Sequence, residues 1–298
     1  MNIDIKYLIN KSEYFIKNKI DLLSYENIDE NTYILKTNDK DYELCISDIN
    51  LNNNLIENNQ QLKLIKADPL EIYEYGYYES SNLYYQIREY RITQSLSDYL
   101  LKHDKKSNYY LGIKFGEILY NLHNLEDTKN LDWYQIFTTK ANYLFYMHGM
   151  LETIADDDYI LVDYINNYRH LTKNNETKYI FNSFSPDEII VSNDKEIFPT
   201  NLHFKVFGDP SFDFTSINTA AIYSVDFARG VYDKYFDGKK APLRFLRLVS
   251  LYQAYEILNN KVALRSDKKA QLSLDTIEKL LKMYDNFNQD YPDWLMEG

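Results

Sequence analysis

The stretch that decides the fold of this chain covers residues 181–214 and has the sequence FNSFSPDEIIVSNDKEIFPTNLHFKVFGDPSFDF. It opens with a polar loop, which Pro186 and the apolar run at residues 189–191 anchor. It closes on the sequence GDPSFDF at residues 208–214, which contains Asp209 and Asp213. This closing sequence is specific enough to serve as the fixed point from which the earlier residues of the stretch can be matched to a known sequence pattern.

The stretch resembles the aminoglycoside phosphotransferase and choline kinase superfamily, whose pattern is roughly H-G-D-x-x-x-x-N-I-L, a hairpin, I-D-[WF], and then G-D-P-x-x-D-[LF]. On this alignment residues 181–183 lie under H-G-D, so Ser183 lies under the family's catalytic Asp. Glu188 lies under its Asn, and Asn201 lies under its second Asp. In such enzymes the first Asp accepts the proton of the attacking hydroxyl, and the other two residues bind magnesium.

The replacements remove chemistry that the resemblance would imply. The hydroxyl of Ser183 cannot accept a proton at neutral pH as a carboxylate does. The amide of Asn201 can ligate Mg²⁺ but brings no charge to offset the phosphates. We therefore expect no catalytic residue and no metal here. Asp187 and Glu188 are the candidates for any residual nucleotide binding, because they could hold a metal from a shifted position.

The amino-terminal part predicts a small sheet. Residues 24–47 predict a strand, a hairpin at residues 37–40 and a second strand with a period-2 alternation of Tyr42, Leu44 and Ile46. Two further strands are expected at residues 70–78 and 83–90. Residues 1–20 predict one amphipathic helix that packs on this lobe.

The resemblance implies that the strand ending near Cys45 should carry a lysine that pairs with the nucleotide phosphates. Cys45 offers no fixed positive charge, and as a residue in a strand it is expected to be a small buried hydrophobe. Glu57, in a predicted helix at residues 54–66, stands where the family's partner of that lysine would be. It is a third candidate for cofactor binding.

We predict an α+β, two-lobed, protein-kinase-like fold, with a small antiparallel β-sheet lobe at residues 1–92 and a larger, mainly helical lobe at residues 93–298. Ser95, with Asp98 three residues later, is expected to cap the first helix of the large lobe. Residues 111–123, LGIKFGEILYNLH, match a family helix and have apolar residues at helical spacing. Further helices are expected at residues 243–258 and 272–287.

Three residues are expected to be structural. His123 ends the matched helix, where a packed, hydrogen-bonded histidine is the simplest interpretation. The resemblance implies that Asp213 braces the loop through hydrogen bonds and that Asp209 keeps its place in the closing sequence. The acidic run at residues 156–158 is expected to be a solvated loop or a helix start and not a metal site.

Composition limits the partners. With 33 basic and 45 acidic residues the net charge is −12, and no basic stripe is present, so nucleic acid and anionic membranes are not expected to bind. A single cysteine excludes an internal disulfide and fits a reducing, cytoplasmic location.

Thirty tyrosines suggest coding bias or, as the alternative, a tyrosine-rich contact surface. The densest group consists of Tyr73, Tyr75, Tyr77, Tyr78, Tyr84 and Tyr85, and alternate members should face solvent.

Two functions remain open. The first is a catalytically inactive kinase-like protein that binds a protein partner or forms a homo-oligomer, as a scaffold, a regulatory partner or a coat component, with no cofactor. The second is a divergent phosphotransferase that uses Mg-ATP or Mg-GTP to phosphorylate a hydroxyl of a small cation such as an aminoglycoside or choline. The joint replacement at Cys45, Ser183 and Asn201 favours the first.

Overall fold

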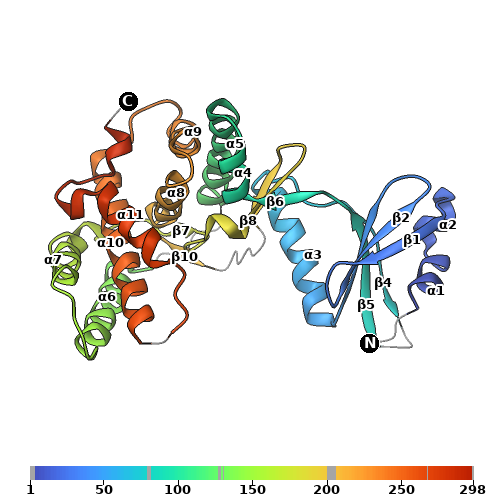
Figure 1. Cartoon of the computed structure of the whole chain (residues 1–298), viewed down its shortest axis with the longest axis horizontal. Coiled ribbons are helices and arrows are strands. Elements are labelled where there is room, and N and C mark those ends of the chain that lie inside the picture. Colours follow the sequence, from blue (N-terminus) through green and yellow to red (C-terminus); the bar gives the residue numbers. More distant parts are fainter. Residues whose placement is uncertain are drawn as a thin grey trace. The chain divides into compact units, whose positions relative to one another are not determined.

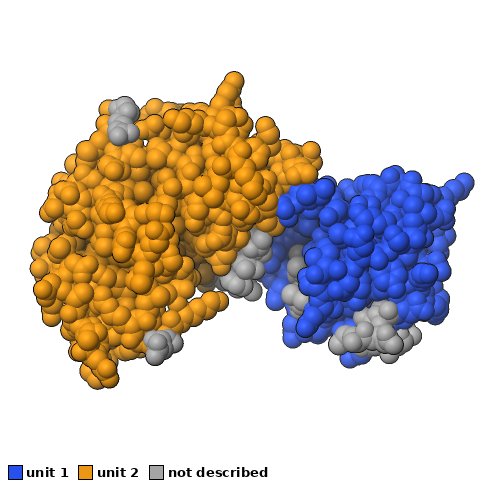
Figure 2. All heavy atoms as spheres, in the orientation of Figure 1, with its two compact units in different colours: residues 1–63, 67–93 blue, residues 64–66, 94–298 orange. Residues whose placement is uncertain are grey.

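The computed structural model describes residues 4–78, 82–126, 129, 131–199, 206–266 and 268–296, without the side chains of residues 51, 52 and 55. The chain forms two compact units, which Figure 2 shows in different colours. The first contains residues 1–63 and 67–93, and the second contains residues 64–66 and 94–298.

The first unit is built on a five-stranded antiparallel sheet with the strand order β1-β2-β3-β5-β4. Its strands are β1 (Leu22–Asn27), β2 (Thr32–Thr37), β3 (Tyr42–Ser47), β4 (Ile72–Tyr78) and β5 (Leu83–Glu89), and α3 (Ile49–Leu64) connects β3 to β4. The hairpin expected at residues 37–40 is confirmed, because Thr37 Oγ1 accepts hydrogen bonds from the backbone of Asp39 and Lys40. The predicted alternation in β3 is also confirmed, since its three apolar residues lie in one buried cluster.

Two short helices, α1 (Ile5–Asn10) and α2 (Glu13–Asn18), pack against this cluster. The single helix expected over residues 1–20 is therefore wrong. Ser12 interrupts it, because its Oγ accepts a hydrogen bond from the backbone of Phe15 and so caps a new helix. Glu74 on β4 fixes this break: its carboxylate accepts from Ser12 Oγ at 2.6 Å and from the backbone N–H of Tyr14 at 2.7 Å.

The second unit is mainly helical (Figure 1). Its helices include α4 (Leu96–Lys102), α5 (Lys105–His123), α6 (Trp133–Gly149), α7 (Asp158–Tyr168), α8 (Phe214–Ala221), α9 (Val225–Tyr235), α10 (Leu243–Arg265) and α11 (Leu274–Met283). Its short strands are β6 (Thr93–Ser95), β7 (Lys178–Tyr179), β8 (Ile189–Ser192), β9 (Ile197–Pro199) and β10 (Phe207–Gly208), which form the sheets β6-β8-β9 and β10-β7. The helix expected at residues 111–123 is confirmed as part of α5, and Ser95 caps α4 as expected, since its Oγ accepts from the backbone of Asp98.

Helices α5 and α9 lie side by side in backbone contact (Figure 1). A Cβ atom at Gly112 would lie 2.1 Å from the carbonyl oxygen of Phe227, and one at Gly230 would lie 2.2 Å from that of Tyr109. A Cβ atom at Gly116, one turn further along α5, would lie 2.6 Å from the carbonyl oxygen of Val231 on α9. No side chain fits at these positions, so glycine sets the distance between the two helices.

A buried charge cluster joins α7 to α10. Asp158 is fully buried, and its carboxylate lies 2.6 Å from Lys261 Nζ, pairs with Arg265, and lies 3.1 Å from His148 Nε2. Burial raises the pKa of Asp158, but hydrogen bonds from Arg265 and Lys261 outweigh it and lower the pKa to about 2. The expectation of a solvated acidic run is therefore wrong for Asp158, which lies at a helix start but inside the protein.

In the described part of the chain, no helix combines the length and the apolar composition that crossing a membrane requires.

We expect Gly112→Ala to lower the free energy of unfolding by about 1–3 kcal/mol or more, because the added methyl group would overlap the backbone of α9. Urea unfolding followed by circular dichroism would measure this. Gly149→Ala is the matched control: nothing lies within 4 Å of a Cβ there, and alanine favours the helix by up to about 1 kcal/mol. Equal stability of the two variants would contradict the close contact.

Candidate functional site

The loop at residues 181–188 is held by one carboxylate. Asp213 is fully buried, and its oxygens accept hydrogen bonds from the backbone N–H of Phe181 at 2.8 Å and of Asn182 at 2.9 Å. The Nε2 atom of His123 lies 3.1 Å from the same carboxylate, and its Nδ1 atom lies 2.8 Å from the hydroxyl of Tyr235. Asp213 therefore ties the loop to the end of α5.

The backbone of this loop is bent into an uncommon conformation. Asn182 and Ser183 have φ angles of 63° and 67°, in the left-handed region that most residues avoid. The next residue, Phe184, donates its backbone N–H to Ser216 Oγ at 2.8 Å, which fixes the loop to α8. These contacts fix the backbone on both sides of Ser183, the residue that the sequence alignment puts under the base.

Phe181 and Phe184 pack against α5 by their rings. The ring centroid of Phe115 lies 6.3 Å from that of Phe181 and 5.4 Å from that of Phe184. Both loop phenylalanines are half-buried, whereas Phe115 is fully buried. The loop is thus anchored by apolar packing as well as by Asp213.

The two carboxylates proposed for metal binding are already engaged. Ser185 and Glu188 form a capping box over the short helix Pro186–Glu188: Glu188 accepts from the backbone N–H of Ser185 at 2.8 Å. Asp187 accepts a hydrogen bond from Ser97 Oγ on α4. Among the residues with described positions, no three His, Cys, Asp or Glu side chains converge as a metal ion would require. Asn201 lies outside the described residues.

Cys45 and Glu57 belong to the first unit. Cys45 is buried in β3, with Thr32 and Gln86 beside it on the neighbouring strands. Burial raises the pKa of its thiol. Glu57 is exposed on α3, and its carboxylate accepts a hydrogen bond from Gln61 at 3.1 Å.

Asp209 is buried and saturated with hydrogen bonds. Its carboxylate accepts from the backbone and hydroxyl of Ser211 at 2.9 and 2.6 Å, from the hydroxyl of Tyr252 at 2.8 Å, and from Asn175. Tyr252 in turn accepts from the indole of Trp133. This arrangement joins α6 and α10 to the closing sequence, so Asp209 has a structural position.

A small cavity, absent from the sequence predictions, adjoins Ser183. Its volume is about 20 Å³, enough for roughly one water-sized group. It is lined by residues of the loop, α8, α10 and the segment before α11: Ser183, Phe184, Ser185, Thr215, Ser216, Thr219, Gln253, Glu256, Gln271 and Leu272. Hydroxyl groups and amides dominate this lining, together with one carboxyl group.

That carboxyl group belongs to Glu256 on α10, which is 8% exposed. Burial raises its pKa to about 7, and the charge of Lys140 offsets this only in part. No described residue donates a hydrogen bond to it. Its oxygens are not fully enclosed, but a carboxyl that loses most of its hydration without a described donor still favours a hydrogen-bond donor or a cation in the cavity. The only signal in the sequence was a charged residue among the apolar positions of residues 243–258.

Glu256 makes the stability of the protein depend on pH. Its folded pKa of about 7 exceeds the ordinary value of 4.5, so the folded state binds its proton more tightly than the unfolded state. Stability should therefore fall as the pH rises from about 4.5 to about 7, by up to roughly 3 kcal/mol from this group.

We expect Glu256→Gln to remove this contribution. Its unfolding free energy relative to the natural protein should rise between about pH 5 and about pH 8, as measured by urea unfolding. Glu278→Gln, at an exposed position on α11, is the control and should leave the pH profile unchanged. Parallel profiles for the natural protein and Glu256→Gln would show that Glu256 titrates normally.

No protein-family model and no curated protein sequence matches this chain. Solved structures do match it. The GDP complex of a point mutant of an aminoglycoside 2′-phosphotransferase-IIIa is 15% identical, with a TM-score of 0.56 over 96% of this chain and 99% of that one. A choline/ethanolamine kinase family protein from Mesorhizobium loti is 11% identical, with a TM-score of 0.55 over 92% and 93%.

A thermostable mutant of aminoglycoside phosphotransferase APH(4)-Ia is 12% identical, with a TM-score of 0.52 over 91% of this chain and 98% of that one. At such low identity these matches establish the fold alone. The expected α+β fold is confirmed, with its five-stranded antiparallel sheet and its mainly helical second unit. The chain has the protein-kinase-like fold that is found in aminoglycoside phosphotransferases and choline kinases.

Proposed function

We propose that this chain is a catalytically inactive, kinase-like protein that acts by binding another protein or a second copy of itself. The observation that carries the proposal is that Asp213 and His123 brace the loop at residues 181–188 through hydrogen bonds. The sequence alignment puts Ser183, in this loop, where the family has its base. A shaped loop without a proton acceptor supports a role in binding.

The carboxylates near this loop support the same conclusion. Recruiting Glu188 to a metal would break the capping box, at a cost of about 0.5–2 kcal/mol. Asp187 would have to give up its hydrogen bond from Ser97. In the first unit, the raised pKa of Cys45 keeps that side chain neutral where a phosphate-binding lysine would be charged. We therefore infer that neither magnesium nor a nucleotide is a cofactor.

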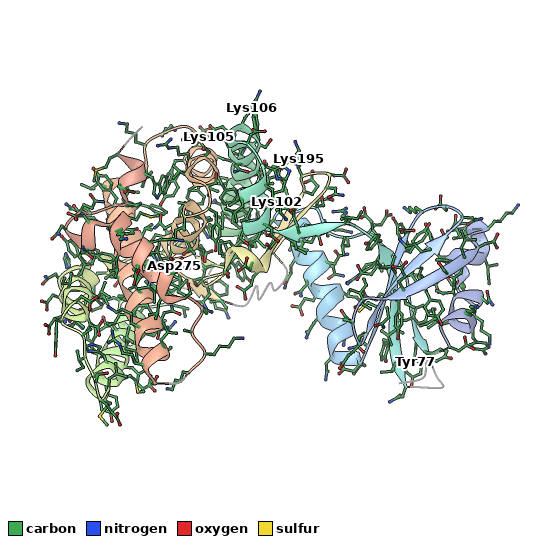
Figure 3. All side chains as sticks on the ribbon, viewed as in Figure 1. Tyr77, Lys102, Lys105, Lys106, Lys195 and Asp275 are labelled. Atoms are coloured by element: carbon green, nitrogen blue, oxygen red, sulfur yellow. The ribbon has the colours of Figure 1, made fainter. Side chains whose placement is uncertain are left out.

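The tyrosines of β4 are a suitable contact surface. Tyr75 and Tyr77 are 66% and 46% exposed, and they lie on an edge strand of the sheet. The ring of Tyr77, labelled in Figure 3, packs on Tyr84 at 5.1 Å, which restricts its motion. Ordered, exposed tyrosines offer a large contact area at a small entropic cost.

Inactivity is tested by thermal denaturation with ATP or GTP, each with and without Mg²⁺. A nucleotide at about 100 times its dissociation constant would add about 2.7 kcal/mol of stability. We expect no shift at millimolar nucleotide. A magnesium-dependent shift that Glu188→Ala abolishes would overturn the proposal.

Binding through β4 is tested by sedimentation velocity over a wide range of protein concentration. We expect self-association that the double variant Tyr75→Ser, Tyr77→Ser weakens. Tyr143→Ser, Tyr146→Ser is the control, because these two tyrosines are also exposed but lie on α6. A monomer at every concentration would exclude the second copy and leave a different protein as the partner.

A second function is favoured by one observation, the buried Glu256 carboxyl beside Ser183. A protonated amine in that cavity would neutralise it, as expected for a small cationic substrate whose hydroxyl attacks the γ-phosphate of ATP or GTP. Without a positioned base such transfer would be slower by about two to four orders of magnitude. Phosphorylation of an aminoglycoside that requires Glu256 would establish this second function; choline, whose quaternary ammonium group has no N–H and exceeds the volume of this cavity, would not depend on Glu256 in this way.

A further inference from the structure

A larger cavity lies elsewhere in the second unit and has no connection with the loop at residues 181–188. Its volume is about 520 Å³, within the range of small-molecule sites. It lies between α5, α9, the start of α10 and the C-terminal turn Asp293–Leu295. It shares no lining residue with the cavity beside Ser183.

The inner wall of this cavity is aromatic and aliphatic. The rings of Tyr232 and Trp294 meet edge to face, with centroids 5.4 Å apart. Leu243, Leu246 and Leu295 extend the apolar lining. The two rings are almost fully covered by the protein, so the apolar surface that a ligand can bury here belongs mainly to the three leucines. Burying such surface contributes about 25 cal/mol per Å².

The charged groups that line this cavity are mainly positive. The positive groups are those of Arg229, Lys239 and Lys240, and the one negative group is the carboxylate of Asp233. This carboxylate accepts a hydrogen bond from the hydroxyl of Tyr109 at 2.9 Å. Arg229 is held in place by its hydrogen bond to the carbonyl oxygen of Trp294 at 3.2 Å. Lys239 and Lys240 are exposed and form no ion pair with a described residue. In a chain of net charge −12, this local excess of positive charge favours an anion.

Two polar groups of the wall are unsatisfied. Tyr232 Oη and Trp294 Nε1 are buried and have no hydrogen-bond partner among the described residues. Leaving such a group unsatisfied costs about 1–3 kcal/mol. Both atoms are covered by protein, so a ligand would gain this hydrogen bond only if the wall rearranged.

We propose that this cavity binds an amphipathic monoanion, with an apolar chain or ring system against Leu243, Leu246 and Leu295 and a carboxylate head group at Lys239 and Lys240. The apolar wall and the cationic rim are both needed for this class of ligand. A cation of the same shape would be repelled at the rim, and a small inorganic anion would leave the wall uncovered.

The probe for the test is 1-anilinonaphthalene-8-sulfonate, an apolar anion whose fluorescence reports binding to the full chain. We expect saturable binding that dodecanoate displaces and dodecyltrimethylammonium does not. The double variant Lys239→Glu, Lys240→Glu should weaken binding by about tenfold or more. Leu246→Trp, which adds bulk inside the cavity, should weaken it without any change of charge.

Lys105→Glu, Lys106→Glu is the matched control, because it changes the net charge equally at two exposed lysines at the start of α5 (Figure 3). This control should bind the probe as the natural protein does, and circular dichroism should confirm that every variant is folded. If both double variants lost binding equally, the loss would be explained by the change in net charge and not by the position of the lysines, and the proposal would be overturned. Displacement by both amphiphiles, or full binding by folded Leu246→Trp, would overturn it as well.

Discussion

The carboxylate of Asp213 receives hydrogen bonds from two regions that are far apart in the sequence: the backbone at residues 181–182 and the ring of His123. All of these groups would lose their partner together if the carboxylate were removed, and buried networks of this kind act as units. The left-handed backbone at Ser183 and the cavity beside it both depend on this anchor. The conformation of the loop is fixed by Asp213 and His123, whereas its chemistry depends on the side chain at residue 183. The loop can therefore keep its conformation when the residue at that position changes.

The described part of the second unit contains buried carboxyl groups in different states. Asp209 and Asp213 are surrounded by donors, and Asp158 is neutralised by Lys261 and Arg265. Their partners explain why they are buried, and so they need no ligand. Glu256 differs, because burial raises its pKa and no described residue donates to it. Within this unit Glu256 is therefore the buried carboxyl group whose burial no described donor offsets.

The sequence predicted best where the signal was local. The helix at residues 111–123 and the hairpin at residues 37–40 follow from spacing and turn residues, and both are present. The break at Ser12 was missed because amphipathic spacing hid a capping residue whose partner, Glu74, comes much later in the chain. The ion pairs of Asp158 and the cavity at Glu256 join segments that are distant in the sequence, which periodicity does not reveal. The place of Asn201 remains a prediction.

The contact of α5 with α9 also bears on how far such a sequence can diverge. Where two backbones touch through glycine, the distance between them does not depend on the size of any side chain, so neighbouring residues can change without moving the helices. Only the three glycines have to stay for the two helices to keep this distance. A contact of this kind tolerates most side-chain substitutions, and the fold of this chain matches that of an aminoglycoside phosphotransferase at 15% sequence identity.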